Sequence, residues 1–130
     1  MLRIENLCNK YNSRVVFNNL NLTVNKGEVI GIIGASGSGK STLLKSILLL
    51  REFESGHIYF KDTEITKKSI GSPAISGKIG LIFQNANSLF YHLSVINNIT
   101  CGLIDIKHMK KKDAYEKAEE LLKLVGLNDK

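Results

Sequence analysis

The sequence has little of several residue types on which whole protein classes depend. It contains no tryptophan, one proline and two cysteines among its 130 residues. Cys8 and Cys101 lie far apart and neither belongs to a Cys-x-x-Cys pair, so the sequence supports neither a zinc site nor a redox motif. We expect two reduced, partly buried thiols. The three histidines are equally scattered, which gives no support to a metal cluster among them.

Long apolar runs are also missing. No run approaches the roughly 18 residues that a membrane-spanning helix needs, and the first residues do not form the apolar stretch of a signal peptide, so we expect a cytoplasmic chain. Acidic residues are fewer than basic ones, 12 against 18, which leaves a formal net charge of +6. Such a surplus favours an anionic partner: a nucleic acid, an acidic lipid or a phosphorylated small molecule.

What is present indicates a globular α/β chain. Hydrophobic residues make up 43% and charged residues 23% of the sequence, which excludes wholesale disorder. Apolar residues alternate with polar ones through much of the first 24 residues, as in antiparallel strands with one buried face. Residues 29–33 and 78–83 form short, nearly continuous apolar runs, which are typical of strands buried on both faces.

The rest of the chain divides into one strand, one loop and three helices. A strand is predicted over residues 57–61, and residues 62–77 are predicted to be mostly loop. Helical spacing of apolar residues predicts helices ending near Leu50, over 93–103 and over about 110–125, with Gly126 as the C-cap of the last one. The predicted core face of that last helix consists of Ala114, Ala118, Leu121, Leu122 and Val125.

One segment indicates a specific chemistry. Residues Gly34 to Ser41 fit the pattern Gly-x-x-x-x-Gly-Lys-Ser/Thr, between a predicted buried strand and a predicted helix. Backbone N–H groups at the start of that helix would surround a phosphate chain, while Lys40 would reach the β- and γ-phosphates and Ser41 would offer its hydroxyl to Mg²⁺. The predicted phosphate-binding residues are Gly34, Ala35, Ser36, Gly37, Ser38, Gly39, Lys40, Ser41 and Thr42.

With this loop, the chain resembles the ATP-binding subunits of ABC transporters, in particular the branch that powers bacterial amino-acid importers. The resemblance covers essentially all 130 residues. It implies that Tyr11 stacks on the adenine of ATP and that Val16 is a second contact. It also implies that Gln84, at the end of Ile79-Gly80-Leu81-Ile82-Phe83-Gln84, is the glutamine that ligates Mg²⁺ and orients the attacking water.

The same resemblance assigns roles and partners. Lys40 and Gln84 would be the catalytic residues, and Ser41 and Gln84 the metal ligands, with ATP and Mg²⁺ as cofactors. The partners would be a membrane permease subunit and a second ATP-binding subunit in a head-to-tail dimer at the inner face of the cell membrane. Tyr91 departs from the family, which commonly has proline there, in a loop that the resemblance places near the contact with the permease.

Several family segments are missing from these 130 residues. The sequence has no apolar run ending in the Asp-Glu pair that would hold Mg²⁺ and activate water, no Leu-Ser-Gly-Gly-Gln signature and no later switch histidine. Asp105 is the nearest candidate, but only two apolar residues precede it and Ile106 follows it. We therefore expect about the first half of a nucleotide-binding domain, as a segment of a longer protein or a truncated reading frame, with at most trace hydrolysis.

The resemblance also predicts the fold. It is an α/β fold: a partial P-loop nucleoside triphosphate hydrolase core (residues 29–56 and 78–84) with an N-terminal antiparallel β-subdomain (mainly 1–28 and 57–77) and the start of a helical subdomain (85–130). In that fold, absent strands would lie between 29–33 and 78–83. We expect these two segments to lack neighbours, which predicts marginal stability or self-association.

Other readings remain open. A soluble ABC-type ATPase acting on nucleic acid or ribosomes would use the positive charge, although the surplus lysines fall largely on polar faces, so we expect no nucleic-acid partner. A decayed nucleotide-binding module would keep the loop and lose the reaction. A small P-loop kinase would not need the N-terminal strands, and a GTPase would need an Asn-Lys-x-Asp motif that the sequence lacks.

Overall fold

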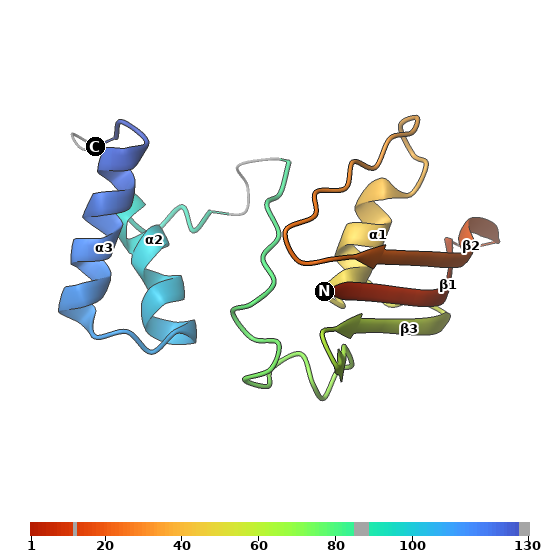
Figure 1. Ribbon diagram of the computed structural model, residues 1–130. Coiled ribbons are helices and arrows are strands. Elements are labelled where there is room, and N and C mark those ends of the chain that lie inside the picture. The colour runs from red at the N-terminus through yellow and green to blue at the C-terminus, as the bar shows by residue number, and fades with distance from the viewer. Residues whose placement is uncertain (12, 85–88, 128–130) are drawn as a thin grey trace. The chain divides into compact units, whose positions relative to one another are not determined.

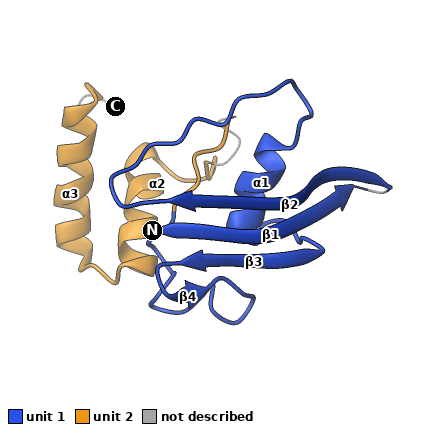
Figure 2. Cartoon of the chain, turned by 45° about the vertical axis from the view of Figure 1, so that its right-hand side comes forward, with its two compact units in different colours: residues 1–79 blue, residues 80–130 orange. Residues whose placement is uncertain are grey.

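The computed structural model describes residues 1–11, 13–84 and 89–127 (Figure 1). The chain divides into two compact units, Met1–Ile79 and Gly80–Lys130 (Figure 2). Unit 1 contains the sheet and the first helix, and unit 2 contains the remaining helices. The predicted division into β-subdomain, core and helical subdomain stays a prediction.

The sheet of unit 1 is antiparallel and confirms the strands expected at the N-terminus. It has the order β2 (Arg14–Val24), β1 (Leu2–Tyr11), β3 (Ser55–Phe60) and β4 (Thr63–Glu64). Alternation in the sequence sets the register: Ile4 lies opposite Leu22 on one side and Ile58 on the other. Register shifts interrupt the pairing of β1 with β2 after Ile4 and with β3 after Glu5, and Asn6, which follows, takes a positive φ of 50°.

One helix, α1 (Lys40–Ile47), packs its apolar side against this sheet and closes the core of unit 1. Leu43 and Ile47 of the helix join Ile4, Leu7 and Ile58 of the strands in one buried cluster. The segment 62–77, predicted to be loop, is irregular apart from β4, and it adds the buried side chains Ile65 and Ile75. The helix therefore begins at the end of the predicted phosphate loop and is fixed by the sheet core.

The prediction of two buried strands is wrong. Residues 29–33 and 78–83 belong to no helix or strand, and Val29, Ile33 and Ile82 are 95%, 97% and 97% exposed. A strand buried on both faces needs a hydrogen-bonded neighbour and a covering layer on each side. The described residues supply neither, so these apolar runs remain outside the sheet.

Unit 2 consists of α2 (Val95–Cys101), which continues as the short π-helix η2 (Gly102–Ile106), and α3 (Lys111–Leu124). Both predicted helices are thus confirmed within a few residues. Ser94 caps α2 by accepting a hydrogen bond from the Asn97 N–H, 3.3 Å away. The Tyr115 hydroxyl of α3 donates to Asn97 Oδ1 at 2.6 Å, which joins the two helices.

The end of α3 forms the C-cap that the sequence predicts. Gly126 has a φ of 73°, its N–H donates to Lys123 O, and the Leu127 N–H donates to Leu122 O at 2.8 Å. The buried face is narrower than predicted. Ala114, Ala118 and Leu122 are buried, but Leu121 and Val125 are exposed. A two-helix pair covers only a narrow stripe of α3, so the sides of the predicted face stay open.

Two further properties concern the chain as a whole. Both cysteines are free and partly buried, as expected. Among the described helices, none combines the length and the apolar character that crossing a membrane requires.

A candidate phosphate-binding site at the start of α1

The segment before α1 is a tight loop. The Ser38 N–H donates to Ala35 O at 3.2 Å, which closes a turn around Ser36 and Gly37. Gly39 then takes a φ of 99° and α1 begins at Lys40, with the Leu43 N–H donating to Gly39 O. The predicted phosphate-binding residues, 34–42, therefore form one continuous turn into a helix N-terminus.

Gly37 and Gly39 of this loop both take a positive φ, 77° and 99°, which favours glycine at these two positions. A Cβ built on Gly39 would lie 2.6 Å from Val16 Cγ1, in a backbone conformation that L side chains rarely adopt. A Cβ on Gly34 would lie 2.8 Å from Ser38 Oγ, the end of a side chain that can rotate away, so this contact alone does not require glycine. The contact with Val16 also shows that β2 passes directly beside the loop. Val16, predicted as a nucleotide contact, is thus brought to the phosphate loop.

The Lys40 side chain folds back over the loop that precedes it. Its ammonium donates to Gly34 O at 2.7 Å, to Ala35 O at 2.8 Å and to Ser38 Oγ at 3.4 Å. These bonds tie the two ends of the loop together and hold the positive charge over it. All three acceptors are uncharged oxygens, so the bonds do not neutralise the ammonium.

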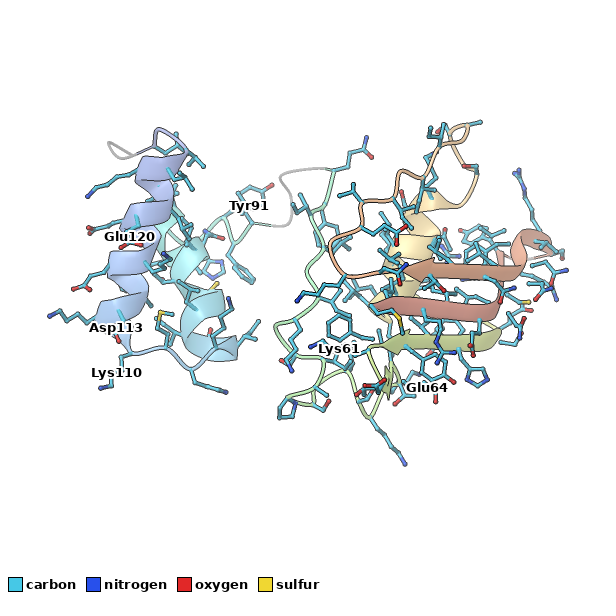
Figure 3. All side chains as sticks on the ribbon, viewed as in Figure 1. Lys61, Glu64, Tyr91, Lys110, Asp113 and Glu120 are labelled. Atoms are coloured by element: carbon cyan, nitrogen blue, oxygen red, sulfur yellow. The ribbon has the colours of Figure 1, made fainter. Side chains whose placement is uncertain are left out.

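Other lysines differ from Lys40 in their partners. Lys10 lies 3.0 Å from Glu54, Lys67 pairs with Glu52, and Lys117 pairs with Glu120 at 2.7 Å, on the helix where Figure 3 labels Glu120. The hydrogen bond from Lys67 lowers the pKa of the Glu52 carboxyl, which keeps this pair charged.

In the part of the chain that the structure describes, Lys40 has no carboxylate partner of this kind. Its charge therefore remains free to attract an anion.

The helix itself adds to this charge. The first turn of α1 contains no acidic residue, and the Gly39 side of the helix has no side-chain cap. Backbone N–H groups at a helix start carry partial positive charge, and they attract anions when no side chain satisfies them. Ser41 is exposed in this first turn and Thr42 is half-buried. The geometry fits a polyanion that is bound by amides and an ammonium together.

Tyr11 lies in the same unit as the loop. It is the last residue of β1, is paired with Arg14 across the hairpin and is 59% exposed. The Arg51 guanidinium lies over its ring, with Cζ 4.9 Å from the ring centroid. No motif in the sequence pointed to Arg51, because its contact with Tyr11 depends on how α1 and β1 pack.

Gln84 is the second predicted Mg²⁺ ligand. It is exposed and irregular, and it belongs to unit 2, whereas Ser41 belongs to unit 1. The pairing of Ser41 and Gln84 at one Mg²⁺ stays a prediction. Asp105, the nearest candidate in the sequence for the missing aspartate, lies in the π-helix η2 and not at the end of a strand. Lys110 and Asp113 stand at the beginning of α3 (Figure 3), and the lysine run 110–112 is exposed.

The family model and the curated relatives that match this chain point to the same protein family. Residues 17–130 match the protein family described as ABC transporter. Over 130 residues the chain is 41% identical to the arginine transport ATP-binding protein ArtM of Bacillus subtilis (strain 168), covering all of this chain and 54% of that protein. It is 40% identical to the L-cystine transport system ATP-binding protein TcyN of Escherichia coli (strain K12), covering 99% of this chain and 54% of TcyN.

A comparison with solved structures points to the same family. The ATP-binding cassette MJ0796, solved as a dimer in a post-hydrolysis state bound to ADP and phosphate, is 28% identical with a TM-score of 0.83, covering 99% of this chain and 59% of that one. This likeness confirms the expected partial P-loop ATPase fold. The chain spans about half the length of the curated relatives that it matches.

Proposed function

Because the chain belongs to the ABC transporter family, we propose that it binds Mg-ATP and contributes the ATP-binding, energy-coupling part of an amino-acid importer. The observation that carries this proposal is the Lys40 ammonium, held on loop carbonyls 2.7 and 2.8 Å away at the start of α1 and, among the residues that the structure describes, not paired with a carboxylate. A triphosphate supplies the negative charge that this arrangement lacks.

Each part of the site has its own task in the proposed mechanism. The amides of the loop and of the first turn of α1 bind the phosphate oxygens, and Lys40 neutralises the charge of the β- and γ-phosphates. The Ser41 hydroxyl is the side chain of unit 1 that would hold Mg²⁺, an ion that prefers oxygen ligands. Tyr11 provides a flat face for the adenine ring, since stacking requires no particular hydrogen-bond pattern.

Turnover by these 130 residues alone is expected to be slow. Binding phosphates is only one part of hydrolysis, which also needs a strand-terminal aspartate for Mg²⁺ and a base for water. Neither occurs in the sequence as a recognisable motif. We expect this chain to bind Mg-ATP and to hydrolyse it far more slowly than the roughly 1 s⁻¹ and above that is typical of enzymes.

The transport role rests on the relatives. ArtM and TcyN are named as ATP-binding proteins of arginine and L-cystine transport. We propose the same class of role here: a polar amino acid as cargo, a membrane permease as partner, a second ATP-binding subunit across the nucleotide, and a location at the inner face of the cell membrane. The cargo itself would be selected by subunits other than this chain.

The test is the affinity for Mg-ATP, measured by isothermal titration calorimetry on three proteins. Lys40→Ala should weaken binding at least about tenfold, because it removes a charge-assisted contact. Lys45→Ala is the matched control, since Lys45 lies exposed in the last turn of the same helix. Equal affinity of Lys40→Ala and the unmodified chain would overturn the proposal.

A further inference from the structure

The end of β1 is connected to the segment that follows α1, residues 51–54. We propose that Arg51, in this segment, is a positioning residue that fixes the Tyr11 ring for a purine base, an inference that rests on the proposed ATP binding. It concerns the base half of the nucleotide, whereas Lys40 concerns the phosphate half. The two halves can therefore be tested separately.

Arg51 contacts Tyr11 through one face of the ring. Its Cζ atom lies 4.9 Å from the ring centroid, within the range of a cation–π contact. Tyr11 is nevertheless 59% exposed, so most of its surface remains uncovered. A ring has two faces, and the guanidinium occupies one of them. A flat base can stack on the part of the ring that the guanidinium leaves exposed.

The segment that carries Arg51 is itself fixed to β1. The Glu54 N–H donates to Cys8 O at 3.0 Å, and Lys10 Nζ lies 3.0 Å from the Glu54 carboxylate. Asn9 Nδ2 donates to Glu52 O at 3.2 Å. Three consecutive residues of β1, numbers 8–10, thus contact either Glu52 or Glu54. The contact between Arg51 and Tyr11 adds one more link between the end of β1 and the segment 51–54.

These contacts also connect the end of β1 to the phosphate loop, through α1. Asn9 Nδ2 also lies 3.5 Å from Ser46 Oγ, and both side chains are buried, Asn9 at 2% exposure. Ser46 is on α1, whose first residue is Lys40. Tyr11 and the loop therefore belong to one bonded frame, and this frame sets their separation. A purine with a triphosphate chain offers one chemical group to each of these two sites.

Arginine suits this position better than another cation. The arginine guanidinium is planar and delocalised, so it can lie flat on an aromatic ring. Without it, the Tyr11 side chain at the end of β1 would regain rotational freedom, and binding a base would then cost the entropy of ordering it. Loss of Arg51 should therefore weaken binding of the base and leave binding of the phosphates unchanged.

The experiment compares two probes, Mg-ATP and inorganic tripolyphosphate, on the full 130-residue chain. Arg51→Ala should weaken Mg-ATP binding by about two- to fivefold, the range of an exposed cation–π contact, and leave tripolyphosphate binding unchanged. Arg51→Lys should recover part of the loss, whereas Arg51→Gln should not. In the Tyr11→Ala background, Arg51→Ala should have no further effect. Lys45→Ala serves as the surface-cation control.

The outcomes separate this inference from the proposed function. An unchanged ratio of the two affinities in Arg51→Ala overturns the positioning role while ATP binding stands. Tighter ATP binding by Arg51→Ala also overturns it, because the guanidinium would then compete with the base for Tyr11. Failure of the unmodified chain to bind either probe overturns the proposed function and this inference with it. Far-UV circular dichroism checks folding; should Arg51→Ala unfold, the comparison of Arg51→Lys with Arg51→Gln decides.

Discussion

Two apolar parts of unit 1 have opposite outcomes. The strands β1 and β3 bury Ile4, Leu7 and Ile58 completely, whereas residues 29–33, which are at least as apolar, expose Val29 and Ile33 almost completely. The difference is pairing. β1 has a hydrogen-bonded neighbour on each side and α1 over one face, and residues 29–33 have no strand beside them in the described chain. Hydrophobicity favours burial, but backbone pairing decides where a strand forms.

The largest predicted effect comes from one substitution made in both places. Ile58→Ala should lower the free energy of unfolding by about 2–5 kcal/mol, because it removes fully buried atoms and leaves a cavity. Ile33→Ala should change it by less than about 0.5 kcal/mol, as expected for an exposed position. Urea unfolding followed by circular dichroism measures both. Equal effects would mean that residues 29–33 are packed in solution.

The second prediction concerns the buried polar link between β1 and α1. Asn9→Ala leaves Glu52 O and Ser46 Oγ without the amide that they share, and should cost about 1–3 kcal/mol of stability. Ser46→Ala, which removes only the longer bond, should cost less. A loss for Asn9→Ala no greater than for Ser46→Ala would contradict the connected frame between Tyr11 and the loop.

The third prediction concerns the exposed segment 29–33, where substitution should change self-association and hardly affect stability. Replacing Val29 and Ile33 together with lysine adds charge to an exposed apolar segment, so it should leave the unfolding free energy nearly unchanged and reduce self-association and the binding of a hydrophobic dye. Leu124→Lys is the control, because Leu124 is 81% exposed on a helix and not in an unpaired extended segment. Sedimentation velocity over a concentration series measures the association.

A similar effect of Leu124→Lys and the double variant would show that exposed apolar area in general drives association. A concentration-independent monomer for the unmodified chain would contradict the expectation of self-association directly.

The same contrast explains what the sequence could predict. Alternation in the first 24 residues, the capping glycine Gly126 and the glycine pattern before Lys40 are local signals, and the structure follows them. The strand assignment for 29–33 was wrong because it depended on neighbours that composition does not report. The contact of Arg51 with Tyr11 depends on tertiary packing between α1 and β1, and the sequence offered only a basic residue near the end of a helix.

If the amides from Gly34 to Thr42 bind a triphosphate together with the Lys40 ammonium, their NMR signals must respond to it. The most direct measurement is an amide ¹H–¹⁵N NMR titration of the chain with Mg-ATP and with tripolyphosphate. We expect both ligands to shift the amides of residues 34–42 most strongly, and only Mg-ATP to shift those next to Tyr11. Shifts centred on the exposed lysines 110–112, with the loop amides unchanged, would contradict the account.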